Sequence, residues 1–390
     1  MMQKIVAVAL LLCLLCPAAL AQVYELPDGR NVVLAVGGSF AYARTASGEI
    51  RVWGDNQFGQ LGKGSTKQSF QVSPFKTKNA EIDPSCITDI VPANDYSFLM
   101  MSDGSVYGVG NNSYLPLTKK EGNYTTHVRM ALPEAPAAMA TGFGHAMMLT
   151  PSGEVYAWGR NSQGQVGNGG TKKTQTPSRV PVENIVQIAC GGKFSLALDR
   201  DGVLWGWGDN EFHELLPDTT KNQTTPVRID TGDIDIAVID ACGASVVLLD
   251  KNGTLWTWGK NDMQQLGYDT GGKTTAAPQA VPLPLPVVSV AAYSSQTYAI
   301  LSDGSLWSWG NNSYGQLGQG FRSAASQGVL PGKCWDGDVA LVMGGSLFVV
   351  AMLQDGTVLT AGISKFGQLG RGDAKSQYAL SPNGMNLITD

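Results

Sequence analysis

Short apolar runs alternate with glycine-containing turns along most of the chain, and the same order recurs about every 51 residues. In each unit an apolar run ends in small residues, as at residues 188–192, and a second apolar run follows, as at residues 194–198. A turn of Asp, Asn or Ser followed by Gly leads to a third run, in which aromatic residues occupy alternate positions. The period of two predicts three short strands per unit, joined by tight turns. A weaker, proline-containing segment predicts a fourth strand.

Two dipeptides mark the units. The third predicted strand ends in Trp-Gly in five units and in Val-Gly or Ala-Gly in the other two, at Trp53-Gly54, Val109-Gly110, Trp158-Gly159, Trp207-Gly208, Trp258-Gly259, Trp309-Gly310 and Ala361-Gly362. Asx-Gly precedes this strand in five of the seven units, and it predicts a two-residue hairpin turn because both residues tolerate a positive φ. Because the aromatic positions recur, we expect them to pack against the neighbouring unit rather than bind a carbohydrate.

Seven units of four short strands predict an all-β, seven-bladed propeller, which hides its strand edges by closing into a ring. A solenoid also repeats, but it needs distinct polar end caps. Residues 380–388 instead resemble a segment that leads into a next unit, and residues 32–38 resemble its continuation. We therefore expect the two termini to pair and complete one blade between them, in a single domain over residues 22–390.

The first 21 residues stand outside the repeats. Lys4 precedes an apolar stretch that is too short to cross a bilayer, and Ala19 and Ala21 are the small residues that signal peptidase needs. We expect a secretory signal peptide over residues 1–21, with cleavage before Gln22. The mature protein is then extracellular or periplasmic and has no membrane association. An N-terminal anchor helix and a lipoprotein are the open alternatives.

Composition narrows the class of protein. Charged residues make up 15% of the chain, hydrophobic residues 43%, and the formal net charge is −5. This composition excludes a disordered chain, and the absence of any run of more than two Lys or Arg disfavours nucleic-acid binding. Four cysteines follow the predicted cleavage site, Cys86, Cys190, Cys242 and Cys334. Export permits disulfides. Cys190 and Cys242 share one repeat position in adjacent units, but a disulfide needs Cα atoms within about 7 Å, and we expect adjacent blades to be farther apart than that, so we expect buried thiols.

No group of residues predicts catalysis or metal binding. The three histidines fall in different units without metal-ligand spacing, at His127, His145 and His213. An acidic run lacks the ordered spacing of a calcium loop, at Asp230, Asp233, Asp235 and Asp240. The sequence also lacks a nucleophile elbow and a phosphate-binding loop. We predict no catalytic residue, no metal and no cofactor.

The repeat resembles that of the regulator of chromosome condensation family. The most similar copies are residues 142–167, with Gly142-Phe143-Gly144-His145 and Trp158-Gly159-Arg160-Asn161, and residues 302–318. The resemblance implies a seven-bladed propeller that recognises other proteins on a rigid disc, as the family's exchange factor for a small GTPase does. Two copies depart from the Gly-Gln-Leu-Gly turn that follows Trp-Gly, at residues 115–117 and 214–216, and put that turn in doubt.

We predict an exported, monomeric scaffold that binds another protein through the segments that differ most between units. These segments are residues 65–84, 119–128, 217–236 and 323–338. Their aromatic side chains are the candidate anchors for a protein partner, namely Trp335, Phe70, Phe75 and Tyr124. Two alternatives stay open: a secreted effector that acts as an exchange factor for a small GTPase, and a propeller lyase or hydrolase with titratable side chains at one mouth of the ring.

Overall fold

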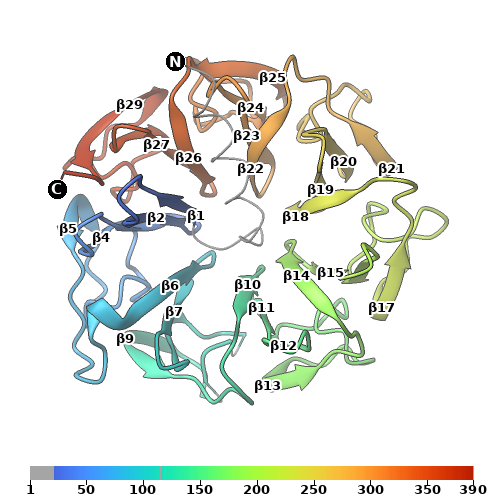
Figure 1. Cartoon of the computed structure of the whole chain (residues 1–390), viewed down its shortest axis with the longest axis horizontal. Coiled ribbons are helices and arrows are strands. Elements are labelled where there is room, and N and C mark those ends of the chain that lie inside the picture. The colour runs from blue at the N-terminus through green and yellow to red at the C-terminus, as the bar shows by residue number, and fades with distance from the viewer. Residues whose placement is uncertain (1–21, 115, 119, 390) are drawn as a thin grey trace.

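A computed structural model describes residues 22–389 apart from 115 and 119, and these residues form seven antiparallel sheets arranged in a ring (Figure 1). The predicted signal peptide lies outside the described residues. The first sheet has five strands and the other six have four. The structure therefore confirms the all-β, seven-bladed propeller. The only helix among the described residues is one turn of 3-10 helix, η2 (Pro84–Cys86).

Each blade runs from an inner strand near the ring axis to an outer strand at the rim (Figure 1). In the order of blades 1 to 7, the inner strands are β2 (Asn31–Val36), β6 (Ile87–Pro92), β10 (Ala138–Thr141), β14 (Ile185–Cys190), β18 (Ile236–Cys242), β22 (Val287–Tyr293) and β26 (Val339–Gly344). The second strands are β3 (Phe40–Arg44), β7 (Tyr96–Met101), β11 (His145–Leu149), β15 (Phe194–Asp199), β19 (Ser245–Asp250), β23 (Gln296–Leu301) and β27 (Phe348–Leu353).

The third and outer strands complete the blades. The third strands are β4 (Ile50–Gly54), β8 (Val106–Asn111), β12 (Val155–Gly159), β16 (Leu204–Gly208), β20 (Leu255–Gly259), β24 (Leu306–Asn311) and β28 (Thr357–Gly362). The outer strands are β5 (Ser69–Pro74), β9 (Asn123–Arg129), β13 (Thr174–Arg179), β17 (Gln223–Ile229), β21 (Thr275–Ala280), β25 (Gly328–Trp335) and β29 (Gln377–Asn386).

The hairpin between the second and third strands is wider than predicted. In blade 2, Met101 N donates to Ser105 O and Gly104 N donates to Met101 O, so three residues lie between the paired ones. Only Gly104 is left-handed, with φ 81°, whereas Asp103 keeps a negative φ and its carboxylate accepts the Ser105 amide at 2.9 Å. The prediction of a two-residue turn was wrong. The Asx residue keeps a negative φ, and its side chain caps the turn by accepting a main-chain amide.

The ring closes without a blade shared between the termini. The C-terminal strand β29 pairs with β28 as the outer strand of blade 7, and β1 (Gln22–Glu25) pairs with β2 as an extra inner strand of blade 1. The predicted pairing of residues 380–388 with the N-terminal segment is therefore wrong. Residues 377–386 already form the outer strand of blade 7, and β2 already forms the inner strand of blade 1. Neither blade therefore needs a strand from the other end of the chain.

Both ends of the chain nevertheless hold blades 7 and 1 together. Val342 N of β26 donates to Gln22 Oε1 of β1 at 2.8 Å, and Ala46 N in blade 1 donates to Leu387 O at 2.7 Å. Apolar side chains of the two blades also form one buried cluster. Blades 7 and 1 are thus joined by side-chain packing and a few hydrogen bonds, as other neighbouring blades are.

The motif tryptophans join neighbouring blades. Each indole Nε1–H donates, at 2.8–3.0 Å, to a main-chain oxygen in the loop that follows the third strand of the preceding blade. The pairs are Trp53–Gln368, Trp158–Pro116, Trp207–Gln165, Trp258–Glu214 and Trp309–Gln265. All five tryptophans are buried. Because a buried carbonyl needs a donor, this bond fixes each blade against its neighbour.

Two blades lack the tryptophan, and the preceding blade supplies a tyrosine instead. Where blade 2 has Val109, Tyr42 OH of blade 1 donates to Gln60 O at 2.8 Å. Where blade 7 has Ala361, Tyr298 OH of blade 6 donates to Gln316 O at 2.9 Å. The other five blades have an apolar residue at the tyrosine position, namely Phe98, Met147, Leu196, Val247 and Val350. Tyrosine therefore stands only where the next blade has no indole.

This exchange predicts a reciprocal rescue at the junction of blades 6 and 7. Tyr298→Leu should lower the free energy of unfolding by about 2–4 kcal/mol, because it leaves a cavity and an unpaired carbonyl. Ala361→Trp alone should destabilise by about 1–3 kcal/mol, because the indole collides with Tyr298. The double variant reproduces the Leu196–Trp258 arrangement of blades 4 and 5 and should recover most of the loss. Urea unfolding of the four proteins measures this, and additive losses would contradict the exchange.

Candidate functional site

Two sets of turns lie together on one face of the ring, which we call the loop face. One set joins the inner and second strands, and the other joins the third and outer strands. In all seven blades an amide at or directly after the end of the third strand donates to a carbonyl of the first set, at 2.8–3.0 Å. The bonds run from Asp55 N to Ser39 O in blade 1 through to Ile363 N to Leu347 O in blade 7. The loop face is therefore a rigid platform rather than a set of independent loops.

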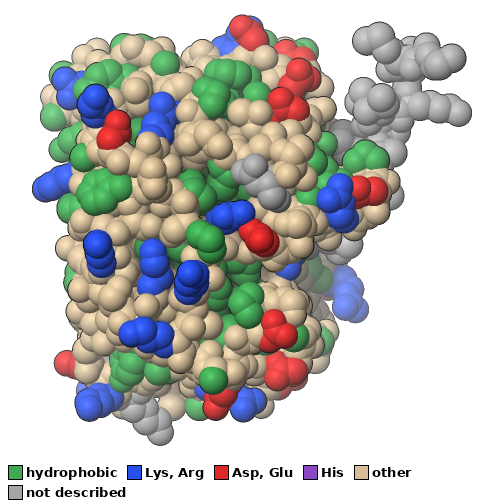
Figure 2. Space-filling view, turned by 90° about the vertical axis from the view of Figure 1, so that its left-hand side faces the viewer, with side chains coloured by type: hydrophobic (Ala, Val, Ile, Leu, Met, Phe, Trp, Pro, Cys, Tyr) green, Lys and Arg blue, Asp and Glu red, His purple; other side chains and the backbone are tan. Residues whose placement is uncertain are grey.

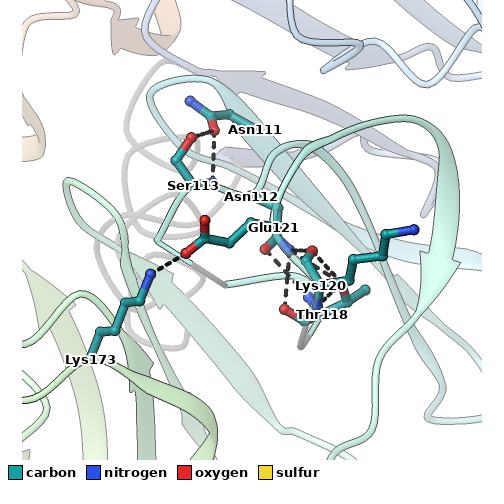
Figure 3. Close-up of polar contacts among 7 residues, drawn as sticks. All are labelled: Asn111, Asn112, Ser113, Thr118, Lys120, Glu121 and Lys173. Atoms are coloured by element: carbon teal, nitrogen blue, oxygen red, sulfur yellow. Dashed lines mark hydrogen bonds and ion pairs between the residues drawn. The ribbon is translucent and has the colours of Figure 1, made fainter.

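An asparagine organises the longer loop of this face in six blades. In blade 2, Asn112 Oδ1 accepts Leu117 N at 2.8 Å, and its Nδ2 donates to Thr118 O and Lys120 O at 3.1 and 2.6 Å (Figure 3). Asparagines at the same position accept the amide five residues further on, at Asn56, Asn161, Asn210, Asn261 and Asn312. The two loops whose turn was in doubt, in blades 2 and 4, therefore keep this asparagine bond.

Further polar contacts hold the blade 2 loop in place. Asn111 Oδ1 accepts both the amide and the hydroxyl of Ser113, at 2.9 and 2.6 Å (Figure 3). Glu121 forms an ion pair with Lys173 of blade 3, so the loop is tied to the next blade (Figure 3). The Asn111 bonds hold the backbone directly before Tyr114, whose ring contacts Arg160 of blade 3.

A cavity of about 400 Å³ lies on the loop face where blades 2 and 3 meet. Its lining includes Asn94, Asp95, Asn111, Tyr114, Phe143 and Arg160. The two aromatic side chains are 44% and 39% exposed, which is high for large apolar groups on a rigid surface. Exposed aromatic side chains beside a cavity are typical of a binding site.

The cavity combines aromatic and charged groups. The Arg160 guanidinium lies 5.1 Å from the centre of the Tyr114 ring, and its Nε donates to Ser162 Oγ at 3.3 Å. Asp95 accepts a hydrogen bond from Asn111 Nδ2 at 2.6 Å. Burial raises the pKa of the Asp95 carboxyl, although the Asn111 bond opposes this shift. A cation, a carboxylate and two aromatic rings are groups that recognise peptide side chains.

The sequence contained a signal for this cavity that the search for variable segments missed. In the other six blades, the residue at the Phe143 position is small or polar, namely Gly38, Asn94, Gly192, Gly243, Ser294 and Ser346. Phe143 is thus a single aromatic exception at a repeat position. A comparison of copies position by position, rather than segment by segment, would have found it.

The predicted anchor residues lie elsewhere and do not come together. Phe75 is buried in the core, where its ring centre lies 6.2 Å from that of Tyr42 and 5.6 Å from that of His127, so it is not available to a partner. Phe70 is half-buried on β5, and Trp335 ends β25 and packs on the buried cluster of blades 6 and 7.

Tyr124 on β9 is also half-buried, and its hydroxyl contacts Thr118 Oγ1 at 2.7 Å. None of the four predicted anchors lines the cavity. They belong to the outer parts of blades 1, 2 and 6. A role in binding stays a prediction for Phe70, Tyr124 and Trp335.

The histidines and cysteines have structural surroundings. His127 and His145 are buried, and burial lowers the pKa of each to about 3, so both rings are neutral at pH 7. Cys190 and Cys242 are buried thiols, as predicted, and burial raises the pKa of Cys242 to about 12. Cys86 and Cys334 are half-buried, and all four cysteines carry free thiols.

Among residues 22–389 apart from 115 and 119, no three His, Cys, Asp or Glu side chains are grouped so that they could hold a metal ion. The same residues include no helix that is long and apolar enough to cross a membrane.

Glu214 is an unusual buried acid beside the loop face. Five blades have glutamine at its position, and Gln60 Nε2 donates to the Asp55 carboxylate at 3.3 Å. In blade 4 the equivalent pair is Glu214 and Asp209. Glu214 Oε2 accepts Phe212 N at 2.9 Å, but Oε1 is buried with no partner among the described residues. Burial raises the pKa of Glu214 to about 8, and the neighbouring Asp209 carboxylate adds to the shift.

Stability should therefore fall as the pH rises. An unfolded glutamate titrates near pH 4.3, so the stabilisation by neutral Glu214 is complete below that pH and lost as the pH rises through about 8. Glu214→Gln should leave stability at pH 4 unchanged and raise it by roughly 1–3 kcal/mol at pH 9. Thermal unfolding across this range measures the effect. Glu183→Gln, at an exposed position between β13 and β14, removes a carboxylate that does not act on Glu214; it is the control and should show no such gain.

Comparisons with known proteins agree with this architecture. The RCC1-like domain family matches residues 125–389, and the regulator of chromosome condensation (RCC1) repeat matches residues 32–60. The human probable E3 ubiquitin-protein ligase HERC6 is 30% identical over 70% of this chain, which spans 23% of HERC6. The Arabidopsis thaliana ultraviolet-B receptor UVR8 is 26% identical over 89% of this chain and 80% of its own length.

A solved structure shares the whole fold. Prp20p from Saccharomyces cerevisiae superimposes with a TM-score of 0.75 and 21% identity over 86% of each chain, and its study concerns binding to Gsp1p and histones. With a family match over most of the ring, and with tryptophan and asparagine positions that repeat in it, the chain belongs to the RCC1-like domain family of seven-bladed propellers.

Proposed function

We propose that this chain is an exported scaffold that binds another protein through the loop-face cavity between blades 2 and 3. The observation that carries the proposal is the pair Tyr114 and Phe143, which stay exposed around Arg160 on a rigid surface. Aromatic and arginine side chains supply most of the binding energy at protein interfaces. The export part rests on the predicted signal peptide and cleavage before Gln22.

The repeat explains why this site and not another is favoured. Side chains that recur in every blade are used for packing and loop formation, so they are not free to recognise a partner. Specific recognition then requires positions where one copy differs. Phe143 is such a position, and the fixed loops around it reduce the entropy that a partner must overcome on binding.

Similar proteins are consistent with protein recognition. Prp20p was studied for its binding to Gsp1p and histones, and exchange on a small GTPase is an alternative role for this chain. A ligase role is less well supported, because the chain spans less than a quarter of HERC6. A lyase or hydrolase would need several convergent titratable groups, whereas the cavity lining we describe offers one carboxylate, Asp95.

Affinity capture with matched variants tests the binding site. Tyr114→Ala with Phe143→Ala should weaken retention of the partner from a native extracellular or periplasmic fraction by about 2–4 kcal/mol. Tyr314→Ala is the control, because Tyr314 has the same repeat position in blade 6 and the same 44% exposure. Equal loss in both proteins, or turnover of a small molecule without a retained protein, would contradict the proposal.

Export is tested separately. The full-length chain, expressed with its first 21 residues, should appear outside the cytoplasm with Gln22 as the first residue by N-terminal sequencing. Replacement of Ala19 and Ala21 by bulky residues should block cleavage. Retention of uncleaved wild-type protein in the cytoplasm would contradict export without affecting the binding proposal.

A further inference from the structure

Blade 1 carries a concentration of positive charge in a chain that is acidic overall. Between Asp55 and Glu81 the sequence has no acidic residue but four lysines, Lys63, Lys67, Lys76 and Lys78. These lysines flank the outer strand β5. Figure 2 views the ring from the side on which β5 lies in Figure 1, and Lys and Arg side chains gather across its middle with few Asp or Glu among them. We call these four lysines the blade 1 basic band.

The basic band is not neutralised from within the chain. Among the described residues none of its four lysines forms an ion pair, whereas eight other Lys or Arg residues do. Lys63 is partly buried and donates to Ser69 Oγ and Ser73 Oγ at 3.4 and 3.3 Å. Burial lowers the pKa of Lys63, and the positive charges of Lys67 and Lys76 lower it further. Like charges thus repel one another here, and an external anion would relieve that repulsion.

A cavity on the other flank of β5 offers hydrogen-bond donors. It measures about 280 Å³, lies where blades 7 and 1 meet, and is lined by Arg51, Gln71, Arg371 and Asn383 among others. The Arg371 side chain is held by Thr360 Oγ1 at 3.2 Å and Ser381 Oγ at 2.6 Å. Asn383 Nδ2 is buried and has no partner among the described residues. The Arg371 donors are therefore fixed and the Asn383 amide lacks an acceptor, whereas Arg51 is paired with Glu49.

We propose that the blade 1 basic band and this cavity bind an acidic segment of a partner protein, which runs beside β5 and places carboxylates on the lysines and on the Arg371–Asn383 donors. The half-buried Phe70 and Val72 add apolar contact between the two flanks. Single-stranded nucleic acid is disfavoured because its binding sites stack bases on several aromatic rings, and β5 offers only Phe70. This surface lies on the outer side of blade 1 and is separate from the loop-face cavity.

The test uses a fluorescein-labelled decaglutamate peptide and the full chain. Fluorescence anisotropy should show saturable binding that weakens as salt is added, because exposed charges are screened. The variant Lys67→Glu, Lys76→Glu, Lys78→Glu should lose about tenfold or more in affinity. The control Lys172→Glu, Lys221→Glu, Lys273→Glu changes the net charge equally at exposed lysines of blades 3 to 5 and should stay within about twofold.

Several results would overturn the proposal. Equal losses in the two triple variants would show a net-charge effect without a site, and no saturable binding would exclude the surface. Binding of single-stranded DNA or heparin about tenfold tighter than decaglutamate would reassign the surface to another class of polyanion. The Tyr114→Ala, Phe143→Ala variant should bind decaglutamate like wild type, so a failure of the loop-face proposal leaves this result interpretable.

Discussion

The hydrogen bond from a buried side chain to a loop carbonyl between two blades is the contact on which this ring depends. Five tryptophans donate it across the junction to the preceding blade, and Tyr42 and Tyr298 donate it within their own blade. Each sheet satisfies its own main-chain groups, so nothing in the sheets themselves fixes the position of one blade against the next. The loop carbonyl is buried between blades, and leaving it without any donor would cost about 1–3 kcal/mol. At three junctions a hydroxyl of the next blade donates to the same carbonyl as well, from Ser97, Ser195 and Thr297. Trp53 supplies this donor to Gln368 across the junction of blades 7 and 1. The ring can therefore close without a shared strand.

That constraint explains which parts of the fold could be predicted. The Trp-Gly pairs and the alternating apolar runs are periodic because every buried loop carbonyl needs a donor and every junction needs similar packing, so the number of blades follows from the sequence. The use of tyrosine in place of tryptophan at two junctions could not be predicted from the sequence in the same way. Tyr42 and Tyr298 belong to a different strand and a different copy from the missing tryptophans, and only the three-dimensional junction brings the two positions together.

The prediction of Phe75 as an anchor for a partner was wrong for a related reason. Phe75 lies in a segment that varies between copies, and such variation predicts surface recognition. In the structure that segment crosses from β5 to β6 and buries its aromatic ring against Tyr42 of β3 and His127 of β9. Variation thus reflects local packing as well as partner choice. Phe143 shows the converse, because an exception at an otherwise regular position exposes a large apolar side chain that packing does not require.

The same reasoning applies to charge. A solvated surface normally mixes acids and bases, and the eight ion pairs found within the described part of the chain follow that rule around the ring. The lysines beside β5 break it, and Glu214 breaks the glutamine pattern of the loops at a position where a carboxyl is poorly solvated. Fold stability favours neither exception.

A repeat protein has the advantage that its other copies show which residues stability alone would select at each position. Each departure from the repeat can therefore be compared with several equivalent positions in the same chain. By that measure the glutamate weakens a junction at high pH, whereas Phe143 and the lysines leave the junctions intact and change only the surface. The last two are therefore the exceptions that recognition explains better than packing does.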